Sequence, residues 1–515
     1  MQTFEWILIL LVSAVCLTAF ARRINVPYPS LLALGGAALA LLPSAPRLQL
    51  NPELTLALFV APVLLDAAFD TSVRDLRANW IPITFLVIAA VGITTIAVAW
   101  TVHVLVPGMP WAVAIALGAI VAPPDAAAAS AILKQLHLPH RLLVILEGES
   151  LLNDASALLI YRIAVLAAVS GDSSAGSIVP ISLLAVVGSV LAGYVLSRLT
   201  LRVTVGVTDV PSAIVLQFAG TFGVWILAER LGLSPIVTVV IYAMSTAREA
   251  PRLIPAQRRI PSYAVWDLAV FVLNVLAFVL IGLQLRPILG ELGPQERIDY
   301  LAIAAIVLGI VVAARFAWVF SYSAVARLAA RRLGPAHWSE GVAPKTKSAL
   351  VVSWCGMRGI VTLAAAYALP AGFAYRDLIL LVAFCVVVGT LVLQGLTLRP
   401  LILALKLHDD HPVEREVSLA AERVIRAGLA VLEHNPTVEA KTIRRELESQ
   451  LSERTEGGSA DRRESYGALR RRIVASQREA LLRMRASGEI GDTAFHQIEA
   501  QLDVAELNAA GGLNG

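Results

Sequence analysis

One stretch of this sequence constrains the fold more than any other, because it places charged side chains inside an apolar run. Residues 145–160 read ILEGESLLNDASALLI and carry Glu147, Glu149, Ser150, Asn153 and Asp154 within eight positions. An ionisable group inside a bilayer costs roughly 2.5–3.5 kcal/mol on insertion scales. These side chains are therefore expected to face a bundle interior or a water-filled cavity.

The spacing of these residues predicts a helix with one polar face. Glu149 lies one turn before Asn153, and Ser150 lies one turn before Asp154. At about 100° per residue the four side chains span an arc of roughly 140°. Their carboxylate, hydroxyl and amide oxygens suit a small hard cation, and the carboxylates also take up protons. A polar patch that only holds helices together is the alternative, and two carboxylates make it costly.

Composition indicates a membrane protein. Hydrophobic residues make up 57% of the 515 positions and charged residues 16%, whereas a soluble protein carries about 25% charged residues. The net charge of +4 gives no indication of nucleic-acid binding. Cys16, Cys355 and Cys385 all lie in apolar runs, which argues against a disulfide framework or a zinc site.

Apolar runs of suitable length predict about thirteen membrane-spanning helices. No basic residue precedes the first run, so we expect a membrane helix there rather than a cleaved signal. Basic residues gather in alternate loops, and the positive-inside rule then places the N-terminus outside and the C-terminus in the cytoplasm. The fold class is therefore predicted to be an all-α polytopic membrane protein. Its runs lie at 6–20, 29–43, 53–69, 81–106, 111–135, 142–169, 178–200, 212–231, 235–246, 264–285, 299–322, 348–370 and 378–405.

The composition changes near residue 410. Residues 411–515 are about a fifth of the chain but hold well over a third of its charged side chains. Helical spacing is visible near 414–434, 437–455, 462–485 and 488–507. We therefore expect a transmembrane domain at 1–410 and a small cytosolic helical tail at 411–515.

A break in the fifth apolar run is predicted at Ala122-Pro-Pro-Asp-Ala126. Two consecutive prolines remove backbone donors and prevent a regular helix. The break exposes carbonyl oxygens and helix ends beside Asp125. Broken helices near the bilayer midplane commonly form the ion sites of secondary transporters.

Two arginines lie deep within apolar runs and need partners. Arg358 stays charged at any relevant pH, so a carboxylate such as Glu149 or Asp154 is expected beside it. Arg315 is also near the middle of its run and is a second candidate partner, for Glu147 or Glu149.

Three further positions suggest roles in the same region. Asp66 is near the end of its run and is either an interfacial charge or part of a cytoplasmic funnel. Gly389 and Gly395 suggest a second broken span that could cross the Pro123-Pro124 break.

The motifs taken together resemble the NhaP/NHE type of monovalent cation:proton antiporter, in a bacterial branch. Residues 147–154, EGESLLND, resemble the family's EGESLxND signature. In the same order follow Trp266-Asp267 to Asn274, then Leu280-Ile-Gly-Leu-Gln-Leu285, Cys355-Gly-Met-Arg-Gly359 and Gln394-Gly-Leu-Thr-Leu-Arg-Pro400. The similarity covers about residues 5–405. It implies two inverted repeats with broken crossing helices, an ion-carrying bundle and a dimerisation bundle, usually in a homodimer.

The resemblance also assigns roles to individual residues. It implies Na⁺ binding at Asp154, with Asp125 and Ser150 as co-ligands, and a structural ion pair between Glu149 and Arg358. It also implies Asp66 as the acidic residue of the third span, and places Asn153 and Pro124 in the cation site. Many members carry Thr-Asp-Pro where this chain has residues 124–126, so the Thr contact is lost or taken over by a backbone carbonyl.

The function implied is exchange of Na⁺ or Li⁺ for H⁺ across the inner membrane of a bacterium, without a resident cofactor and not as an enzyme. Asn153 is neutral beside Asp154, which favours electroneutral one-for-one exchange. K⁺ in place of Na⁺ is the main alternative. A cation channel would pass current without a proton gradient. An intramembrane hydrolase would need a water-activating metal, and no histidine lies beside the carboxylates, since His137 and His140 flank a loop.

Overall fold

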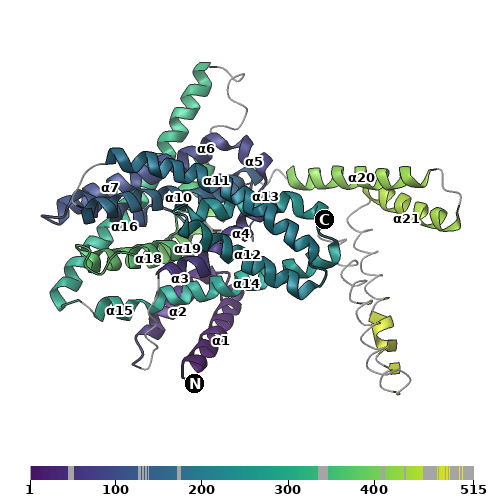
Figure 1. Cartoon of the computed structure of the whole chain (residues 1–515), viewed down its shortest axis with the longest axis horizontal. Helices are drawn as coiled ribbons and strands as arrows, with labels where there is room; N and C mark the ends of the chain where they lie inside the picture. The colour runs from purple at the N-terminus through teal and green to yellow at the C-terminus, as the bar shows by residue number, and fades with distance from the viewer. Residues whose placement is uncertain are drawn as a thin grey trace. The chain divides into compact units, whose positions relative to one another are not determined.

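A computed structural model gives the structure of the chain (Figure 1). It describes residues 2–43, 52–125, 138–170, 175–290, 292–333, 346–407, 412–433 and 437–455, together with a few positions between 129 and 136 and between 473 and 502. The contacts divide the chain into two compact units, Met1–Asp409 and Asp410–Gly515.

Every regular element of the described residues is a helix, which confirms the predicted fold class. Each of the thirteen predicted apolar runs contains helix. Eight described segments are long and apolar enough to cross a bilayer. They are Pro52–Asp70, Trp80–Leu105, His140–Val169, Leu184–Gly206, Val210–Arg230, Ala256–Gly290, Pro294–Leu328 and Arg376–Leu405.

One group of helices in the first unit, which we call the scaffold bundle, comes from the N-terminal helices and the middle of the chain. In it α14 packs along α2, and α13 packs against both α11 and α4. Its helices are α1 (Gln2–Arg23), α2 (Tyr28–Ala40), α3 (Pro52–Thr55), the π-helix η1 (Leu56–Val60), α4 (Ala61–Asp70), α11 (Ala175–Gly206), α12 (Val210–Arg230), α13 (Pro235–Leu253) and α14 (Ala256–Leu283).

The contact between α2 and α14 is made backbone against backbone. A methyl group added to Gly36 would overlap the Val279 carbonyl, and one added to Gly282 would overlap the Ala33 carbonyl. Glycine at both positions therefore lets the two helices approach more closely than any other residue would. This contact makes the α2–α14 pair a rigid part of the scaffold bundle.

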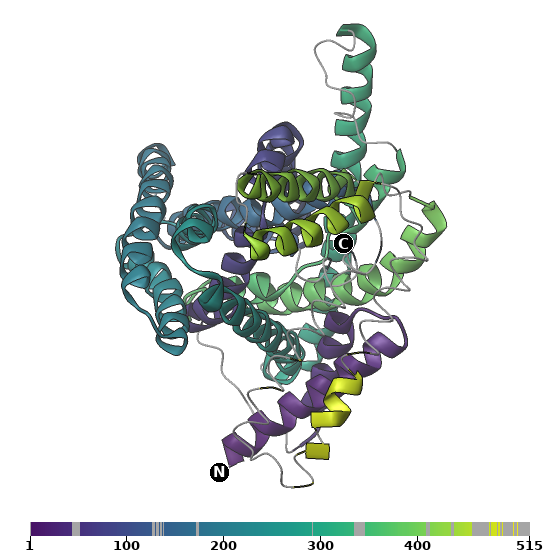
Figure 2. The same cartoon turned by 90° about the vertical axis from the view of Figure 1, so that its right-hand side faces the viewer.

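The other group, which we call the core bundle, contains the polar stretch recognised in the sequence. Here α8 packs between α7 and α10, and α16 packs against α7 and α19. The last turns of α16 project beyond its neighbours (Figures 1 and 2). The helices of the core bundle are α6 (Trp80–Thr84), the π-helix η2 (Phe85–Ala90), α7 (Val91–Leu105), α8 (Trp111–Val121), α10 (His140–Ser170), α16 (Pro294–Leu333), α17 (Thr346–Trp354), α18 (Ile360–Tyr367) and α19 (Arg376–Leu405). Two short helices remain: α5 (Val73–Ala78) packs against α6 and α10 of the core bundle, and α15 (Leu285–Gly290) contacts α2 and α14 of the scaffold bundle and α19 of the core bundle.

The second helix break is not where the glycines suggested. Helix α19 runs without interruption through Gly389 and Gly395, and the chain is unwound instead at Cys355–Gly359, between α17 and α18. A glycine within a helix costs only about 1 kcal/mol relative to alanine, which does not force a break. In α19 the two glycines give room to Leu308 and Ser30, which pack against them.

In the second unit, α20 (Pro412–Leu432) and α21 (Val438–Thr455) form a helical hairpin (Figures 1 and 2). Both agree with the helical spacing of the sequence. The helices expected at 462–485 and 488–507 lie mostly outside the described residues.

The close contact of α2 with α14 predicts that Gly282→Ala lowers the stability of the protein. Extra atoms in a packed interface cost typically about 1–3 kcal/mol. Gly92→Ala in α7 is the matched control, because nothing lies within 4 Å of an added methyl group there. Thermal unfolding of the purified protein in detergent should show a lower midpoint for Gly282→Ala only. Equal midpoints for the two variants would contradict the close contact.

Candidate cation site

The polar stretch forms part of α10, and its polar face is turned into the core bundle. Glu149 is 2% exposed, Asn153 is fully buried and Asp154 is 8% exposed, while Ser150 is half-buried. Glu147, on another side of the helix, is exposed. The helical period therefore places the four polar residues as the sequence predicted.

Two unwound segments meet opposite this face. The first follows α8, which ends at Val121 ahead of the two prolines, and the second joins α17 to α18. The backbone N–H of Asp125 donates to the Met357 carbonyl at 2.6 Å. The two breaks therefore cross in direct contact. The hydrogen bond between them gives each segment a backbone partner in place of one that an unbroken helix would have provided.

The Asp125 side chain packs against the start of α18. A methyl group at Gly359 would overlap its carboxylate. Gly359 is the residue immediately before Ile360, the first residue of α18. The N-terminus of a helix carries partial positive charge and favours an anion. Only glycine at position 359 leaves the carboxylate room at this helix end.

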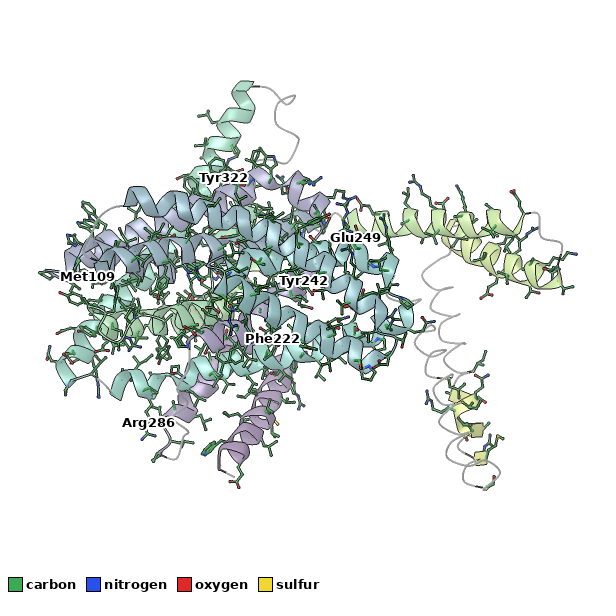
Figure 3. The ribbon with its side chains drawn as sticks, viewed as in Figure 1. Met109, Phe222, Tyr242, Glu249, Arg286 and Tyr322 are labelled. Carbon is green, nitrogen blue, oxygen red and sulfur yellow. The ribbon has the colours of Figure 1, made fainter. Side chains whose placement is uncertain are left out.

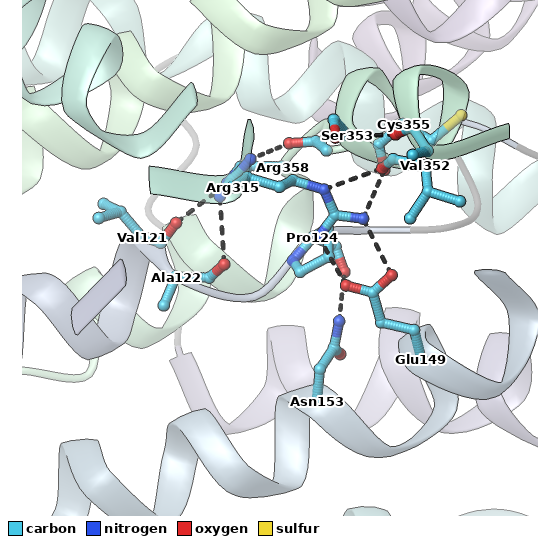
Figure 4. A network of polar contacts seen from close by, with 12 residues as sticks. Val121, Ala122, Pro124, Glu149, Asn153, Arg315, Val352, Ser353, Cys355 and Arg358 are labelled. Carbon is cyan, nitrogen blue, oxygen red and sulfur yellow. Dashed lines mark hydrogen bonds and ion pairs between the residues drawn. The ribbon is translucent and has the colours of Figure 1, made fainter. Parts of the chain in front are cut away.

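Arg358 binds the open end of α8, where helix carbonyls lack partners. Its Nε donates to the Val121 carbonyl at 3.0 Å and one terminal nitrogen donates to the Ala122 carbonyl at 3.2 Å (Figure 4). Its other terminal nitrogen donates to the Gly356 carbonyl. The Arg358 backbone N–H donates to Thr390 Oγ1 at 3.0 Å. A positive charge at a helix C-terminus is favourable, so Arg358 caps the C-terminal end of α8.

Glu149 is paired with Arg315 and not with Arg358, which corrects the expected ion pair. The two terminal nitrogens of Arg315 donate to the two carboxylate oxygens of Glu149 at 2.6 and 2.9 Å (Figure 4). Arg315 Nε also donates to the Val352 carbonyl at 3.1 Å. Both residues are 2% exposed. The physical reason is that the guanidinium of Arg358 is already occupied by three backbone carbonyls.

Asn153 connects α10 to the first unwound segment. Its Nδ2 donates to the Pro124 carbonyl at 3.1 Å. Its Oδ1 is buried and has no hydrogen-bond partner among the described residues. The amide orientation follows from this bond, because the carbonyl accepts and only the NH₂ group can donate. An acceptor oxygen is thereby left inside the site.

Asp154 is the buried carboxylate without a protein partner. Within the described part of the chain it forms no hydrogen bond or ion pair, and the Asp125 carboxylate is close enough to repel it. An ionised carboxylate removed from water costs many kcal/mol unless it is paired. This side chain therefore needs either a cation or a proton.

Asp66 is placed apart from these groups, at a cavity in the scaffold bundle. The cavity has a volume of about 480 Å³ and is also lined by Asp70, Arg259, Asp267 and Tyr242, the last of which is labelled in Figure 3. Both polar and apolar side chains from α4, α11, α12, α13 and α14 contribute to the wall.

Two residues of the site were not found from the sequence. Thr390 is a hydroxyl in the apolar run of α19, and nothing local distinguishes it from a helix-packing threonine. Gly359 appeared in the sequence only as the last residue of the Cys355-Gly-Met-Arg-Gly359 motif, without a role of its own. The local signal that could have identified it is its position directly after Arg358, in Cys355-Gly-Met-Arg-Gly359.

Comparison with known proteins finds matches to one family over most of the chain. Residues 8–404 match the family described as sodium/hydrogen exchanger, transmembrane. An uncharacterized Na⁺/H⁺ exchanger of Mycobacterium tuberculosis is 31% identical over 97% of this chain and 95% of its own length. A low-affinity Na⁺/H⁺ antiporter of Synechocystis is 30% identical over 79% of this chain and 76% of its own. A sodium, potassium, lithium and rubidium/H⁺ antiporter of Bacillus subtilis is 28% identical over 94% of this chain and 74% of its own length.

The fold has a match among solved structures. The structure of the sodium proton antiporter MjNhaP1 from Methanocaldococcus jannaschii at pH 8 superimposes with a TM-score of 0.59. The match covers 79% of this chain and 99% of that one, at 20% identity.

The pairing of Glu149 predicts which double substitution restores stability. Removing either partner of a buried pair strands the other charge, at about 3–5 kcal/mol. Glu149→Gln with Arg315→Met should therefore lose much less stability than the two single losses added together. Glu149→Gln with Arg358→Met serves as the matched control and should show a clearly smaller coupling. Thermal unfolding in detergent measures both cycles, and a larger coupling to Arg358 would contradict the assigned pair.

Proposed function

The chain belongs to the sodium/hydrogen exchanger family, and from this premise we propose that it exchanges one Na⁺ or Li⁺ for one H⁺, with Asp154 as the shared binding group. It is a multi-pass membrane protein and a monovalent cation/proton antiporter, as its motifs predicted. What remains to be argued is which groups bind, which cation is carried and how many charges move.

The observation that carries the proposal is the position of Asp154. Its carboxylate is 8% exposed, and no described residue neutralises it. A cation and a proton would each remove the cost of this buried charge, and one excludes the other. Competition of two ligands for one carboxylate is the simplest basis for exchange.

The oxygens near Asp154 suit a small alkali cation. We propose the Asp125 carboxylate, the Ser150 hydroxyl and the buried Asn153 Oδ1 as co-ligands. Pro124 takes part through its carbonyl, which fixes Asn153 by accepting its Nδ2–H. Such hard oxygen donors favour hard cations.

The charges of the site support one-for-one exchange. Two arginines, Arg315 and Arg358, lie beside three carboxylates, Glu149, Asp125 and Asp154. With all five groups ionised the site carries one net negative charge. One Na⁺ or one H⁺ brings it to zero, so that the site has no net charge in either loaded state.

The two bundles suggest how access could alternate. We propose that the core bundle moves against the scaffold bundle and carries Asp154 between the two faces of the membrane. In this proposal the cavity with Asp66 belongs to the cytoplasmic approach. The N-terminus lies outside and the C-terminus in the cytoplasm, and the scaffold bundle forms the interface of a homodimer.

K⁺ is the second candidate substrate. The Bacillus subtilis relative is named for four alkali cations, and the Synechocystis relative is named for Na⁺ alone. Proline at position 124 in place of the family's threonine removes a hydroxyl ligand, which favours a less selective site.

The proposal predicts that Asp154→Asn abolishes exchange. The amide can neither take up a proton at working pH nor neutralise a cation. Proteoliposomes with an imposed pH gradient and an internal pH dye should respond to Na⁺ and Li⁺ with the native protein, and not with the variant. Asp299→Asn, at an exposed residue in the first turns of α16, is the matched control and should behave as the native protein does.

The same liposomes identify the cation. Addition of Na⁺, Li⁺ and K⁺ in turn ranks the substrates. A response of Asp154→Asn to any of them would show that another group carries the ion. A current without a pH gradient would indicate a channel.

The charge balance predicts that exchange is insensitive to membrane potential. Moving one net charge through 100 mV is worth about 2.3 kcal/mol, so an electrogenic cycle would shift the steady-state pH gradient strongly. The potential can be clamped with valinomycin and K⁺ once K⁺ is shown not to be a substrate. A pH gradient that follows the imposed potential would mean that a second proton is carried.

A further inference from the structure

A hydrogen bond at the end of α18 joins the region of the broken helices to the scaffold bundle. The Tyr367 hydroxyl donates to Gln284 Oε1 at 2.9 Å. Tyr367 is the last residue of α18, in the core bundle, and Gln284 follows the last residue of α14, in the scaffold bundle. The two residues are 83 positions apart in the chain.

On the core side, this bond is connected to the cation site by a single short helix. The residue before α18, Gly359, touches the Asp125 carboxylate, and the last residue of α18 is Tyr367. Eight residues of helix at 1.5 Å each span about 12 Å. Six of the eight are buried, and packed interiors transmit displacement because they have little free volume. A shift at Asp125 is therefore passed along α18 to Tyr367.

On the scaffold side, the acceptor is held rigidly. Gln284 is 2% exposed and lies two residues after Gly282, where α14 meets the backbone of α2. Its Nε2 donates back to the Leu280 carbonyl at 3.4 Å. This bond to Leu280 orients the Gln284 amide so that its oxygen faces the Tyr367 hydroxyl.

We propose that Tyr367 and Gln284 are positioning residues for the exchange reaction, which hold α18 and the Asp125 carboxylate in register with the scaffold in one of the two access states. The inference rests on the proposed function, because it requires the core bundle to move against the scaffold. When it moves, α18 leaves α14 and the hydrogen bond breaks. The bond therefore contributes to the balance between the two states, and ion occupancy at Asp125 acts on that balance through α18.

Tyr367→Phe tests this inference because it removes only the hydroxyl. The population of the second state should rise about two- to tenfold, which is the effect of losing one typical hydrogen bond. Spin labels are placed at Leu41, which follows the end of α2, and at Arg297 in α16, because both positions are exposed. The distance between the two labels reports the position of the core bundle relative to the scaffold bundle. Cys16 and Cys385 are first replaced by serine, while Cys355 is buried.

Two further variants separate this role from a loss of packing. Tyr300→Phe is the matched control, because Tyr300 is a half-buried core-bundle tyrosine whose hydroxyl has no hydrogen bond among the described residues. It should leave the distances unchanged. Gln284→Leu should shift them as Tyr367→Phe does, and the double variant should shift them no further than either single change.

The outcomes distinguish the inference from the function on which it rests. Native protein that exchanges no cation in liposomes would overturn the proposed function. Native protein that exchanges cations, with distance distributions for Tyr367→Phe equal to those of Tyr300→Phe, would overturn this inference alone. Additive shifts in the double variant would also overturn it, because the two side chains would then act separately.

Discussion

The fold depends on two unwound segments that satisfy each other's backbone groups. Lipid offers no hydrogen bonds, so irregular backbone at membrane depth is stable only where protein or water supplies them. Here the Asp125 N–H is bound by the Met357 carbonyl, and the carbonyls at the end of α8 are bound by the Arg358 side chain. Without the crossing, either break alone would leave buried donors and acceptors unpaired. The crossing also brings Asp125 to the start of α18, beside the polar face of α10.

The buried charges follow from that crossing. An arginine at the C-terminal end of a broken helix needs no carboxylate, because carbonyl oxygens and the helix dipole stabilise it. Glu149 is therefore available to Arg315, whose two parallel hydrogen bonds give a strong and directional pair. Among the described residues, Asp154 is then left as a buried carboxylate that no ion pair neutralises. On our proposal, Glu149 serves the stability of the fold and Asp154, on the same helix, serves transport.

The two bundles differ in how their helices pack. In the scaffold bundle, glycines bring α2 and α14 into backbone contact, which leaves little freedom between them. In the core bundle, short half-helices end at the cation site, and α18 continues from there to the scaffold. On our proposal, a displacement at the site is carried along α18 to the scaffold bundle. Such an arrangement favours a change between two discrete positions over gradual deformation.

The sequence by itself determined the helices, the polar face of α10 and the first break. Each follows from local chemistry: apolar length, a 3.6-residue period, and two prolines that cannot continue a helix. Only the tertiary structure decided that Glu149 pairs with Arg315, that the second break is at Cys355–Gly359 and that α19 is continuous. Both arginines lie mid-span with the same chemistry, and glycine costs a helix too little to mark a break. The long-range partner of a buried side chain depends on which backbone groups lack hydrogen bonds once the helices have packed. A local sequence pattern does not predict those groups.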